Sequence, residues 1–166
     1  MEFTEQYIQG VWVIQPKRFG DARGYFSETF KKDEFQAHVG AVEFVQDNES
    51  FSSYGVLRGL HFQKGEFSQA KLVRVSRGRV LDVAVELSAE LGNQLYIPRG
   101  FAHGFVVLSD EAQFQYKVDN VYAPHSEATL KFNDPQLGID WRIPLQDVLL
   151  SPKDEAGLPL EAIKPF

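Results

Sequence analysis

The sequence predicts an all-β barrel or sandwich, because short runs of alternating or β-branched residues are separated by glycine, proline and aspartate. Segments that could form an amphipathic helix are scarce. No internal repeat, low-complexity tract or linker divides the chain. With 166 residues, 43% of them hydrophobic, the chain can bury a sizeable core. We therefore expect a single domain over residues 1–166.

The expected strands all have the usual length of a strand in a globular protein. In the first half of the chain they cover residues 10–15, 24–30, 43–48, 56–63, 71–76 and 79–86. In the second half they cover residues 94–97, 104–108, 112–118 and 129–132. The one expected helix covers residues 32–38, with Asp33 as its N-cap. Proline and charged residues accumulate after Asn133, so we expect an ordered tail of coil and short turns that lies over the barrel.

Charge and composition argue against several classes of protein. The net charge is −6 and the 17 basic residues are scattered, which argues against a surface for nucleic acid. There is no cysteine, which excludes disulfides, zinc–thiolate sites and thiol nucleophiles and is compatible with a reducing compartment. The N-terminus is acidic where a secretory signal needs bases, and no apolar run approaches the roughly 20 residues of a membrane span. We expect a cytoplasmic protein that binds neither nucleic acid nor membrane.

The run V-L-R-G-L-H-F-Q at residues 56–63 is the first with chemical information. In a regular strand Arg58 would lie on one face, and His61 would lie on the other with Gly59 and Gln63. On this run alone, His61 is equally well explained as a core histidine held by a hydrogen bond or as an acid–base group.

A second histidine, His103, follows the end of an expected strand in P-R-G-F-A-H-G, residues 98–104. This P-x-G-x-x-H spacing resembles the second motif of cupins, whose first motif supplies H-x-H and a glutamate to a metal ion. Here Gln63 occupies the position of the second histidine, and glutamine is a poor ligand beside imidazole, although Glu66 could lend an oxygen. We expect no bound metal, so both histidines are free to act as acid or base.

Longer runs, in order and nearly from end to end, resemble the dTDP-4-dehydrorhamnose 3,5-epimerase (RmlC-like) family. They cover residues 19–28, 44–48, 56–63, 71–74, 78–85, 94–105, 114–117, 133–134, 138–141 and 150–154. The resemblance implies a cupin-type jelly-roll β-barrel with short helical turns and an ordered C-terminal tail. It also implies an isomerase that epimerises C3 and C5 of dTDP-4-dehydro-6-deoxy-D-glucose, giving dTDP-4-dehydro-L-rhamnose for cell-surface polysaccharide synthesis.

Epimerisation beside a ketone requires removal of a proton from one face of the sugar, return of a proton on the other face, and stabilisation of the enolate between the two steps. The resemblance assigns the base to His61, its hydrogen-bond partner to Asp154, the opposing acid to Tyr116 and the cation near the enolate oxygen to Lys71. Without the resemblance, Asp154 would be interpreted as a helix or turn cap, Tyr116 as a packing residue and Lys71 as a solvated strand-edge lysine.

The resemblance also assigns residues that bind the pyrophosphate, the base and the sugar. Arginine suits phosphate oxygens, which fits Arg23 and Arg58. The further positions are the polar residues Glu28, Gln46 and Asn48, the aromatic residues Phe26 and Tyr122, and His103 in the lining of the cavity. In the family the segment 23–28 comes from the neighbouring subunit, so the resemblance implies a homodimer with shared sites, and no cofactor.

One stretch departs from the family pattern. After L-D-V-A-V at residues 81–85, family members continue through an I-R-x-x-S-P-T-F-G-like turn and another strand, whereas E-L-S-A-E at residues 86–90 follows directly here. The missing stretch is about one β-hairpin, roughly 15 residues. It is either a deletion that removes a barrel edge or a dimer contact, or a loop left out of this sequence. The strand pairing over residues 82–97 is therefore open.

Two other classes of function remain open. One is a related enzyme that epimerises a single carbon or isomerises the ketone of a nucleotide-linked sugar, which deuterium incorporation would distinguish. The other is a metal-binding cupin or a barrel that only binds a nucleotide sugar, which metal analysis and a His61→Ala binding test would identify. The H-F-Q spacing argues against the metal version, and the acid–base residues argue against binding alone.

Overall fold

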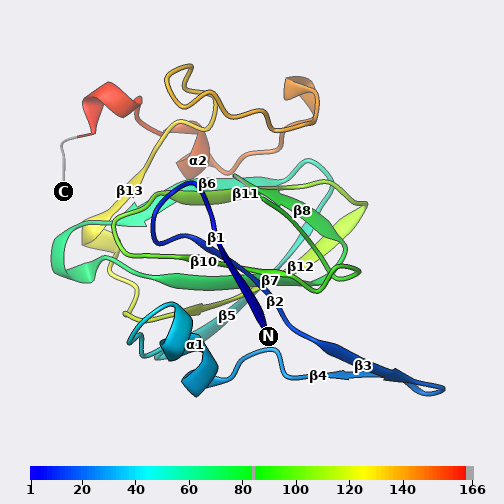
Figure 1. The fold of residues 1–166 in the computed structure, drawn as a ribbon. Coiled ribbons are helices and arrows are strands. Elements are labelled where there is room, and N and C mark those ends of the chain that lie inside the picture. Colours follow the sequence, from blue (N-terminus) through cyan, green and yellow to red (C-terminus); the bar gives the residue numbers. More distant parts are fainter. Residues whose placement is uncertain (84, 164–166) are drawn as a thin grey trace.

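Two facing antiparallel sheets form the body of the molecule, as the computed structural model describes for residues 1–83 and 85–163 (Figure 1). The larger sheet has, in spatial order, β1 (Glu2–Glu5), β2 (Trp12–Gln15), β10 (Gln94–Ile97), β7 (Lys71–Arg77), β12 (Glu111–Val118) and β5 (Gln46–Ser53). The smaller sheet has β13 (Glu127–Thr129), β6 (Leu57–Gln63), β11 (His103–Val107), β8 (Arg79–Asp82) and β9 (Val85–Ser88). The all-β prediction is confirmed.

A hairpin and a few short helical elements complete the fold. The hairpin pairs β3 (Arg18–Asp21) with β4 (Gly24–Ser27). The helices are α1 (Lys32–His38) and α2 (Pro152–Glu155), and the 3-10 turns are η1 (Gly65–Phe67), η2 (Pro124–Ser126), η3 (Leu145–Asp147) and η4 (Leu160–Ala162). No helix in the described ranges is both long and apolar enough to cross a membrane.

The main core lies between the two sheets, because alternate side chains of their strands point inward. Val73 of the larger sheet and Val80 of the smaller sheet are both fully buried in it. Phe105 and Phe114 stack across the interior with ring centroids 4.0 Å apart. Such an aromatic pair stabilises the core by roughly 1 kcal/mol beyond the burial of its area.

Helix α1 covers the outer face of the larger sheet. Its Phe35 is buried and packs edge-on against Tyr96 of β10, with ring centroids 5.3 Å apart. The helix has the predicted bounds, but the predicted N-cap is wrong. Lys31 occupies the N-cap without a side-chain hydrogen bond, and Asp33 lies in the first turn. An acid in the first turn is still favourable there, because it faces the positive end of the helix dipole.

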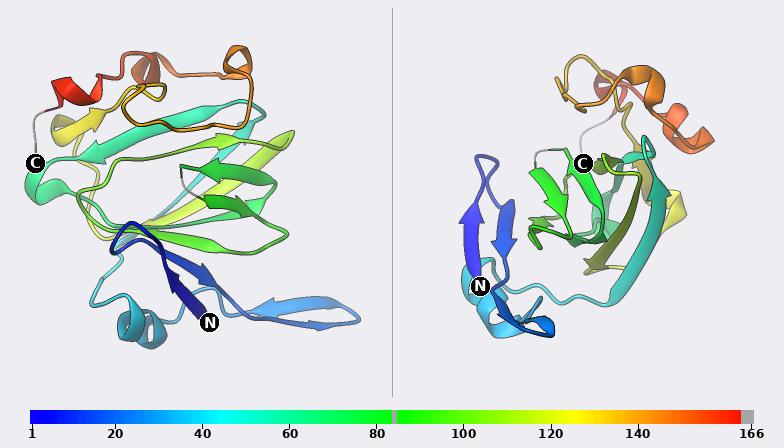
Figure 2. Two further views of the ribbon diagram at one scale, coloured as in Figure 1. Left: turned by 45° about the horizontal axis from the view of Figure 1, so that its top comes forward. Right: turned by 90° about the vertical axis from the view of Figure 1, so that its right-hand side faces the viewer.

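The tail after β13 lies across the outer face of the smaller sheet, as predicted (Figures 1 and 2). Trp141 is buried there and donates through Nε1 to the carbonyl oxygen of Phe132. The buried Asp134 accepts from the backbone N–H of Leu160 at 2.7 Å and of Gln136 at 2.8 Å. These bonds hold the tail in one path, which positions α2 beside β6.

Several predicted strand boundaries are wrong. Residues 79–86 form two antiparallel strands, β8 and β9, instead of one, which lets the opposing Val80 and Leu87 both enter the core. The strand predicted at residues 43–48 begins later and continues as β5, because Phe44 packs in the cluster around α1. The strand predicted at residues 129–132 ends at Thr129, and Leu130 bridges the tail at Leu158. Strands β1 and β3 had no predicted counterpart.

Candidate active site

A cavity of about 420 Å³ opens between the two sheets and the tail. The polar and charged side chains that line it come from both sheets, from α2 and from the loops beside them. They are Ser50, Arg58, His61, Gln63, Gln69, Lys71, His103, Tyr116, Tyr122, Glu127, Ser151, Lys153 and Asp154. The four predicted catalytic residues are therefore brought together in one place.

Strand β6 does not alternate regularly between Arg58 and His61, and the prediction that they lie on opposite faces is wrong. Both pair with β11, but the two residues between them lie opposite Gly104 alone. This bulge adds one residue to β6, so Arg58 and His61 line the same cavity. Gly59 lies in the bulge with a φ of +124°, and a Cβ there would lie 2.6 Å from Cα of Gly104. Glycine is required at this close approach.

His61 and Asp154 are in direct contact. Nε2 of His61 donates to Oδ1 of Asp154 at 2.6 Å, and the same oxygen accepts from the backbone N–H of Gly59 at 3.2 Å. The other carboxylate oxygen accepts from Oγ of Ser151 at 2.6 Å. Ser151, not Asp154, is the N-cap of α2, so Asp154 is free to point into the barrel. Within the described residues Nδ1 of His61 has no hydrogen bond, so this nitrogen can take a proton from a ligand.

Burial lowers the pKa of His61, and the positive charge of Lys153 lowers it further. The carboxylates of Asp154 and Glu127 act in the opposite direction but do not reverse the shift. The imidazole is therefore neutral at neutral pH, which is the form that a general base needs.

Lys71 and Tyr116 come from the sheet that faces His61. Burial lowers the pKa of Lys71 to about 8, opposed by the charges of Asp82 and Glu127. Burial also raises the pKa of Tyr116, although the nearby Arg58 acts in the opposite direction. At neutral pH the cavity thus holds an ammonium and a protonated phenol opposite a neutral imidazole.

A second histidine–aspartate pair lies beside the first. His61 and His103 are paired residues of β6 and β11. Nε2 of His103 donates to Oδ2 of Asp82 at 2.7 Å, and both side chains are buried. The ring of His103 also stacks on Phe114. The sequence placed His103 in the cavity but gave no sign of its partner, because Asp82 sits in an ordinary apolar strand.

Glu127 and Lys153 also line the cavity, and sequence reasoning missed both. Nζ of Lys153 donates to Oε1 of Glu127 at 2.5 Å, and the hydroxyl of Tyr122 donates to Oε2 of Glu127 at 2.8 Å. The available signal for Lys153 was its place next to Asp154. A lysine in a predicted coil is usually solvated, so that signal was weak.

Gln63 ties two loops to β6. Its Nε2 donates to the carbonyl oxygens of Phe67 at 2.6 Å and Val121 at 3.1 Å, and its Oε1 accepts from the N–H of Ala123 at 2.7 Å. The amide is thus fully engaged with backbone. Residues 1–83 and 85–163 contain no group of three or more histidine, cysteine or acidic side chains that could hold a metal ion.

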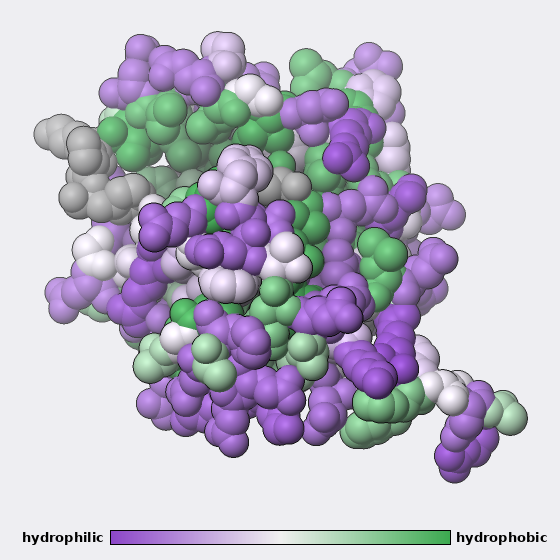
Figure 3. Space-filling view, in the orientation of Figure 1, coloured by the Kyte–Doolittle hydropathy of each residue, from purple (hydrophilic) through white to green (hydrophobic). Residues whose placement is uncertain are grey.

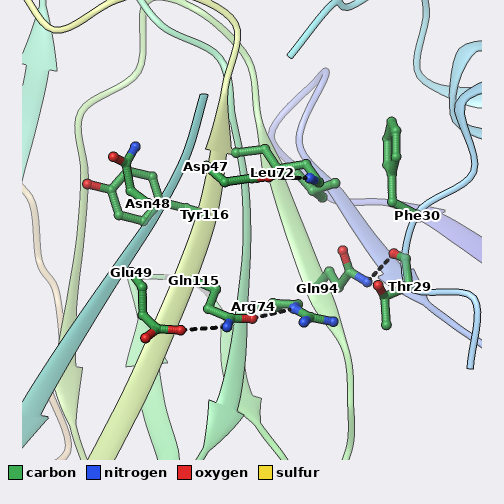
Figure 4. A pocket seen from close by; sticks show the side chains of 11 residues that line it. Thr29, Phe30, Asp47, Asn48, Glu49, Leu72, Arg74, Gln94, Gln115 and Tyr116 are labelled. Atoms are coloured by element: carbon green, nitrogen blue, oxygen red, sulfur yellow. Dashed lines mark hydrogen bonds and ion pairs between the residues drawn. The ribbon is translucent and has the colours of Figure 1, made fainter. Parts of the chain in front are cut away.

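A second hollow of about 370 Å³ adjoins the cavity and shares Tyr116 with it (Figure 4). Asn48 pairs with Tyr116 across β5 and β12, so the two side chains lie side by side. Gln46 donates to Oδ1 of Asn48 at 2.7 Å. These two predicted binding residues therefore lie at the edge of the site. On the other face of β12, Gln115 joins Arg74 to Glu49.

Besides Gln46 and Asn48, which lie at its edge, three predicted binding residues do not line the cavity. Arg23 and Phe26 belong to the β3–β4 hairpin, which projects from the body of the molecule, and Glu28 follows it (Figure 3). Phe26 is 65% exposed, and Arg23 pairs with its neighbour Asp21. Within this one chain the hairpin makes no contribution to the site.

Comparison with known proteins agrees with this arrangement. A sequence model of the family described as dTDP-4-dehydrorhamnose 3,5-epimerase matches residues 5–89 and 83–162. The chain belongs to this family. It is 47% identical to the dTDP-4-dehydrorhamnose 3,5-epimerase of Escherichia coli (strain K12) over 179 aligned positions, which cover 98% of this chain and 96% of the relative.

Two solved structures of the family are also similar. The dTDP-4-dehydrorhamnose 3,5-epimerase of Elizabethkingia anophelis NUHP1 has a TM-score of 0.93 and 48% identity, covering 97% of both chains. The dTDP-6-deoxy-D-glucose-3,5-epimerase of Legionella pneumophila Philadelphia 1, solved in complex with dTDP-4-keto-L-rhamnose, has a TM-score of 0.92 and 42% identity, covering 98% of this chain and 94% of that one. These likenesses confirm the predicted cupin-type jelly-roll fold of the epimerase family.

The comparisons also locate the departure after Val85. The alignment with the E. coli epimerase has 179 positions, more than the 166 residues of this chain, so the relative has residues that this chain lacks. The family model matches in two stretches that overlap at residues 83–89, a span that includes β9. None of the cavity-lining residues lies in that span.

Proposed function

We propose that the protein converts dTDP-4-dehydro-6-deoxy-D-glucose to dTDP-4-dehydro-L-rhamnose by epimerisation at C3 and C5. Membership of the 3,5-epimerase family supports this activity. The observation that carries the mechanism is the position of His61 and Tyr116 on facing sheets, on either side of one cavity. A sugar ring between the two sheets has a base on one face and an acid on the other.

In the first step Nδ1 of neutral His61 removes the proton next to the C4 ketone. Asp154 stabilises the imidazolium that forms, because its carboxylate already accepts from Nε2 at 2.6 Å. The electron pair of the broken C–H bond moves onto the ketone oxygen, where the Lys71 ammonium stabilises the enolate. Tyr116 then donates its phenolic proton to the opposite face of the carbanion carbon. His61 and Tyr116 exchange protons with solvent before the next cycle.

We further propose that the active protein is a homodimer in which the β3–β4 hairpin completes the partner's site. The projection of the hairpin and the exposure of Phe26 support this. Arg23 and Arg58 would then bind the pyrophosphate, and Glu28, Gln46 and Asn48 would contact the nucleotide or sugar. Phe26 and Tyr122 would pack on the flat faces of the ligand.

The setting we propose is the cytoplasm, in the dTDP-L-rhamnose branch of lipopolysaccharide or cell-wall polysaccharide synthesis. The lack of cysteine fits a reducing compartment. The charge of the substrate also supports the cytoplasm, because a nucleotide-linked sugar that carries a pyrophosphate does not cross a membrane unaided.

The test is deuterium uptake by dTDP-4-dehydro-6-deoxy-D-glucose in heavy water, measured by mass spectrometry. Two deuterons with the wild type and none with His61→Ala would support the double epimerase with His61 as base. Tyr116→Phe should still exchange the proton that His61 removes, but it should form little epimerised product. One deuteron with the wild type would indicate a mono-epimerase. No uptake would overturn the proposal and return the binding and metal-cupin hypotheses, which metal analysis would separate.

A further inference from the structure

The β3–β4 hairpin is attached to the body of the molecule at its base. Within the described ranges neither of its strands pairs with a strand of the two facing sheets, and the hairpin projects away from them (Figure 1). Before the hairpin, Gln15 donates through Nε2 to the carbonyl oxygen of Leu91 at 3.0 Å. After it, the carbonyl oxygen of Thr29 accepts from Nε2 of Gln94 at 2.5 Å. These two attachments define an axis about which the hairpin can still turn, so a further contact is needed to fix its direction.

Arg18, the first residue of β3, makes such a contact with the turn between β9 and β10. Its Nη1 donates to the carbonyl oxygen of Glu90 at 2.5 Å, and its Nη2 donates to that of Ala89 at 2.6 Å. The planar guanidinium thus bridges two successive carbonyl groups in one fixed orientation. Hydrogen bonds from a charged donor are roughly twice as strong as neutral ones, so Arg18 holds the hairpin more firmly than either amide at its ends.

The turn that receives Arg18 is held by bonds of its own. Asn93 is buried, and its Nδ2 donates to the carbonyl oxygen of Glu86 at 2.8 Å. Its Oδ1 accepts from the N–H of Ser88 at 3.3 Å, and the N–H of Gly92 donates to the carbonyl oxygen of Ser88 at 2.8 Å. A Cβ at Gly92 would lie 2.3 Å from Nη2 of Arg18, so the guanidinium packs directly against this glycine. The acceptors of Arg18 are therefore in place independently of the hairpin.

The bonds of Arg18 also decide which face of the hairpin is presented to the outside. Successive side chains of a strand point to opposite faces. Arg18 shares its face with Tyr25, whose ring centroid lies 4.4 Å from Cζ of Arg18. Phe19 and Phe26 are paired across the two strands on the opposite face and are 52% and 65% exposed. With Arg18 bound to the turn, the face that carries Phe19 and Phe26 points away from it.

We propose that Arg18 is a positioning residue for the neighbouring subunit's site: it locks the hairpin to the β9–β10 turn, so that Arg23 and Phe26 are aimed at the partner's cavity. The inference rests on the proposed homodimer with shared sites, and Arg18 itself does not touch the substrate. A hairpin that is fixed in advance loses little conformational freedom when a ligand binds, which favours affinity. The role of Arg18 therefore lies in binding and not in proton transfer.

The first test is Arg18→Gln, because glutamine carries no charge and is too short to bridge the two carbonyl oxygens. We expect the Kd for dTDP, measured by calorimetry, and the KM for the keto-sugar to rise about tenfold, while kcat changes little. Arg142→Gln is the matched control. Arg142 is an exposed arginine of the tail that lines neither hollow, so the same change of charge there should leave both constants unaltered. Equal effects in both variants, or a loss confined to kcat, would overturn the inference.

Heterodimers purified with two different affinity tags show which cavity the defect reaches. Arg58→Ala removes dTDP binding from its own cavity, so one intact cavity remains in each mixture. Paired with Arg58→Ala, the Arg18→Gln chain keeps an intact cavity that the unaltered hairpin completes, and we expect wild-type affinity for dTDP. Wild type paired with the double variant Arg18→Gln/Arg58→Ala should bind about tenfold more weakly, because the altered hairpin completes the intact cavity. The reverse pattern would mean that Arg18 only stabilises its own chain.

Gly92→Ala tests the same contact from the side of the turn, because the added Cβ would displace the guanidinium. It should weaken dTDP binding about as much as Arg18→Gln, and the two changes together should weaken it no further. Losses that add would mean that Arg18 does not act through this turn. The affinity readouts need no turnover. If they follow the expected pattern while the wild type takes up no deuterium, the proposed reaction fails and the role of Arg18 stands.

Discussion

Nε2 of His61 lies 2.6 Å from Oδ1 of Asp154, although the two residues are 93 positions apart in the chain. The histidine belongs to the barrel and the aspartate to the tail, so the pair forms only when the tail is docked. The carboxylate is held in place by Ser151 and by the backbone of Gly59. Its geometry is therefore set before any ligand arrives, which is what a preorganised base requires.

Asp154→Asn should lower kcat by roughly two to four orders of magnitude, the range typical for loss of general base catalysis. The amide can still accept from His61 but does not stabilise the imidazolium. Steady-state epimerisation and deuterium exchange both measure the effect. Glu155→Gln is the control, because Glu155 is exposed on the same short helix. Similar losses in both variants would mean that α2 matters only as structure.

The pH profile of kcat/KM should be bell-shaped. His61 must be neutral, and burial lowers its pKa below 6.5, so activity should fall only as the pH drops below that value. Lys71 must be protonated, so activity should fall as the pH rises through about 8. Tyr116, whose pKa is raised by burial, should not limit the rate below pH 10. An acid limb above pH 6.5 would contradict the environment found for His61.

Lys71→Met should make the protein more stable and less active. The folded state lowers the pKa of Lys71 from 10.5 to about 8. The unfolded chain thus binds more protons between these pH values, and wild-type stability should rise with pH across this window. At pH 7 the cost of the buried ammonium is at most about 3 kcal/mol, which methionine removes.

Urea denaturation at pH 7 measures this gain. Lys117→Met is the control, because Lys117 is a partly exposed lysine of β12 that pairs with Asp47. Its replacement should change the free energy of unfolding by less than about 1 kcal/mol. An equal gain in both variants would mean that added apolar area, not the buried charge, is responsible.

Mixed dimers test the shared site. Arg23→Ala and His61→Ala should each be nearly inactive alone, but after unfolding and refolding together they should recover about a quarter of wild-type activity. In a heterodimer one site carries both defects and the other carries neither. His61→Ala mixed with Lys71→Met should recover no activity. Both residues line the cavity of their own chain, so each site of such a heterodimer carries one defect. Failure to recover activity in the first mixture would indicate that each chain completes its own site.

Much of the fold could be predicted because its causes are local. The run that became β12 alternates between apolar and polar residues, and those that became β7 and β10 are short runs with apolar residues at strand length. The residues of α1 bury Phe35 on one face. The turn between β8 and β9 could not be predicted in this way, because residues 79–86 contain no glycine or proline to mark it. Only the pairing of Val80 with Leu87 on neighbouring strands, which buries both side chains in the core, explains why two strands form.

The candidate site was predictable where the chain keeps family motifs and unpredictable where contacts are long-range. His61, Lys71 and Tyr116 lie in such motifs, and the structure brings them together. The shared face of Arg58 and His61 depends on a bulge that only the approach of Gly104 explains. Asp82 gave no signal, since its partner His103 is on another strand.

The position of Asp154 beyond the last strand has a consequence for how the enzyme is made. All strands of both sheets precede the aspartate in the chain, because β13 ends at Thr129 and α2 begins at Pro152. A chain that stops between these two points contains every strand of the barrel but no partner for His61. We therefore expect a ribosomal product that stops short of α2 to lack catalytic competence.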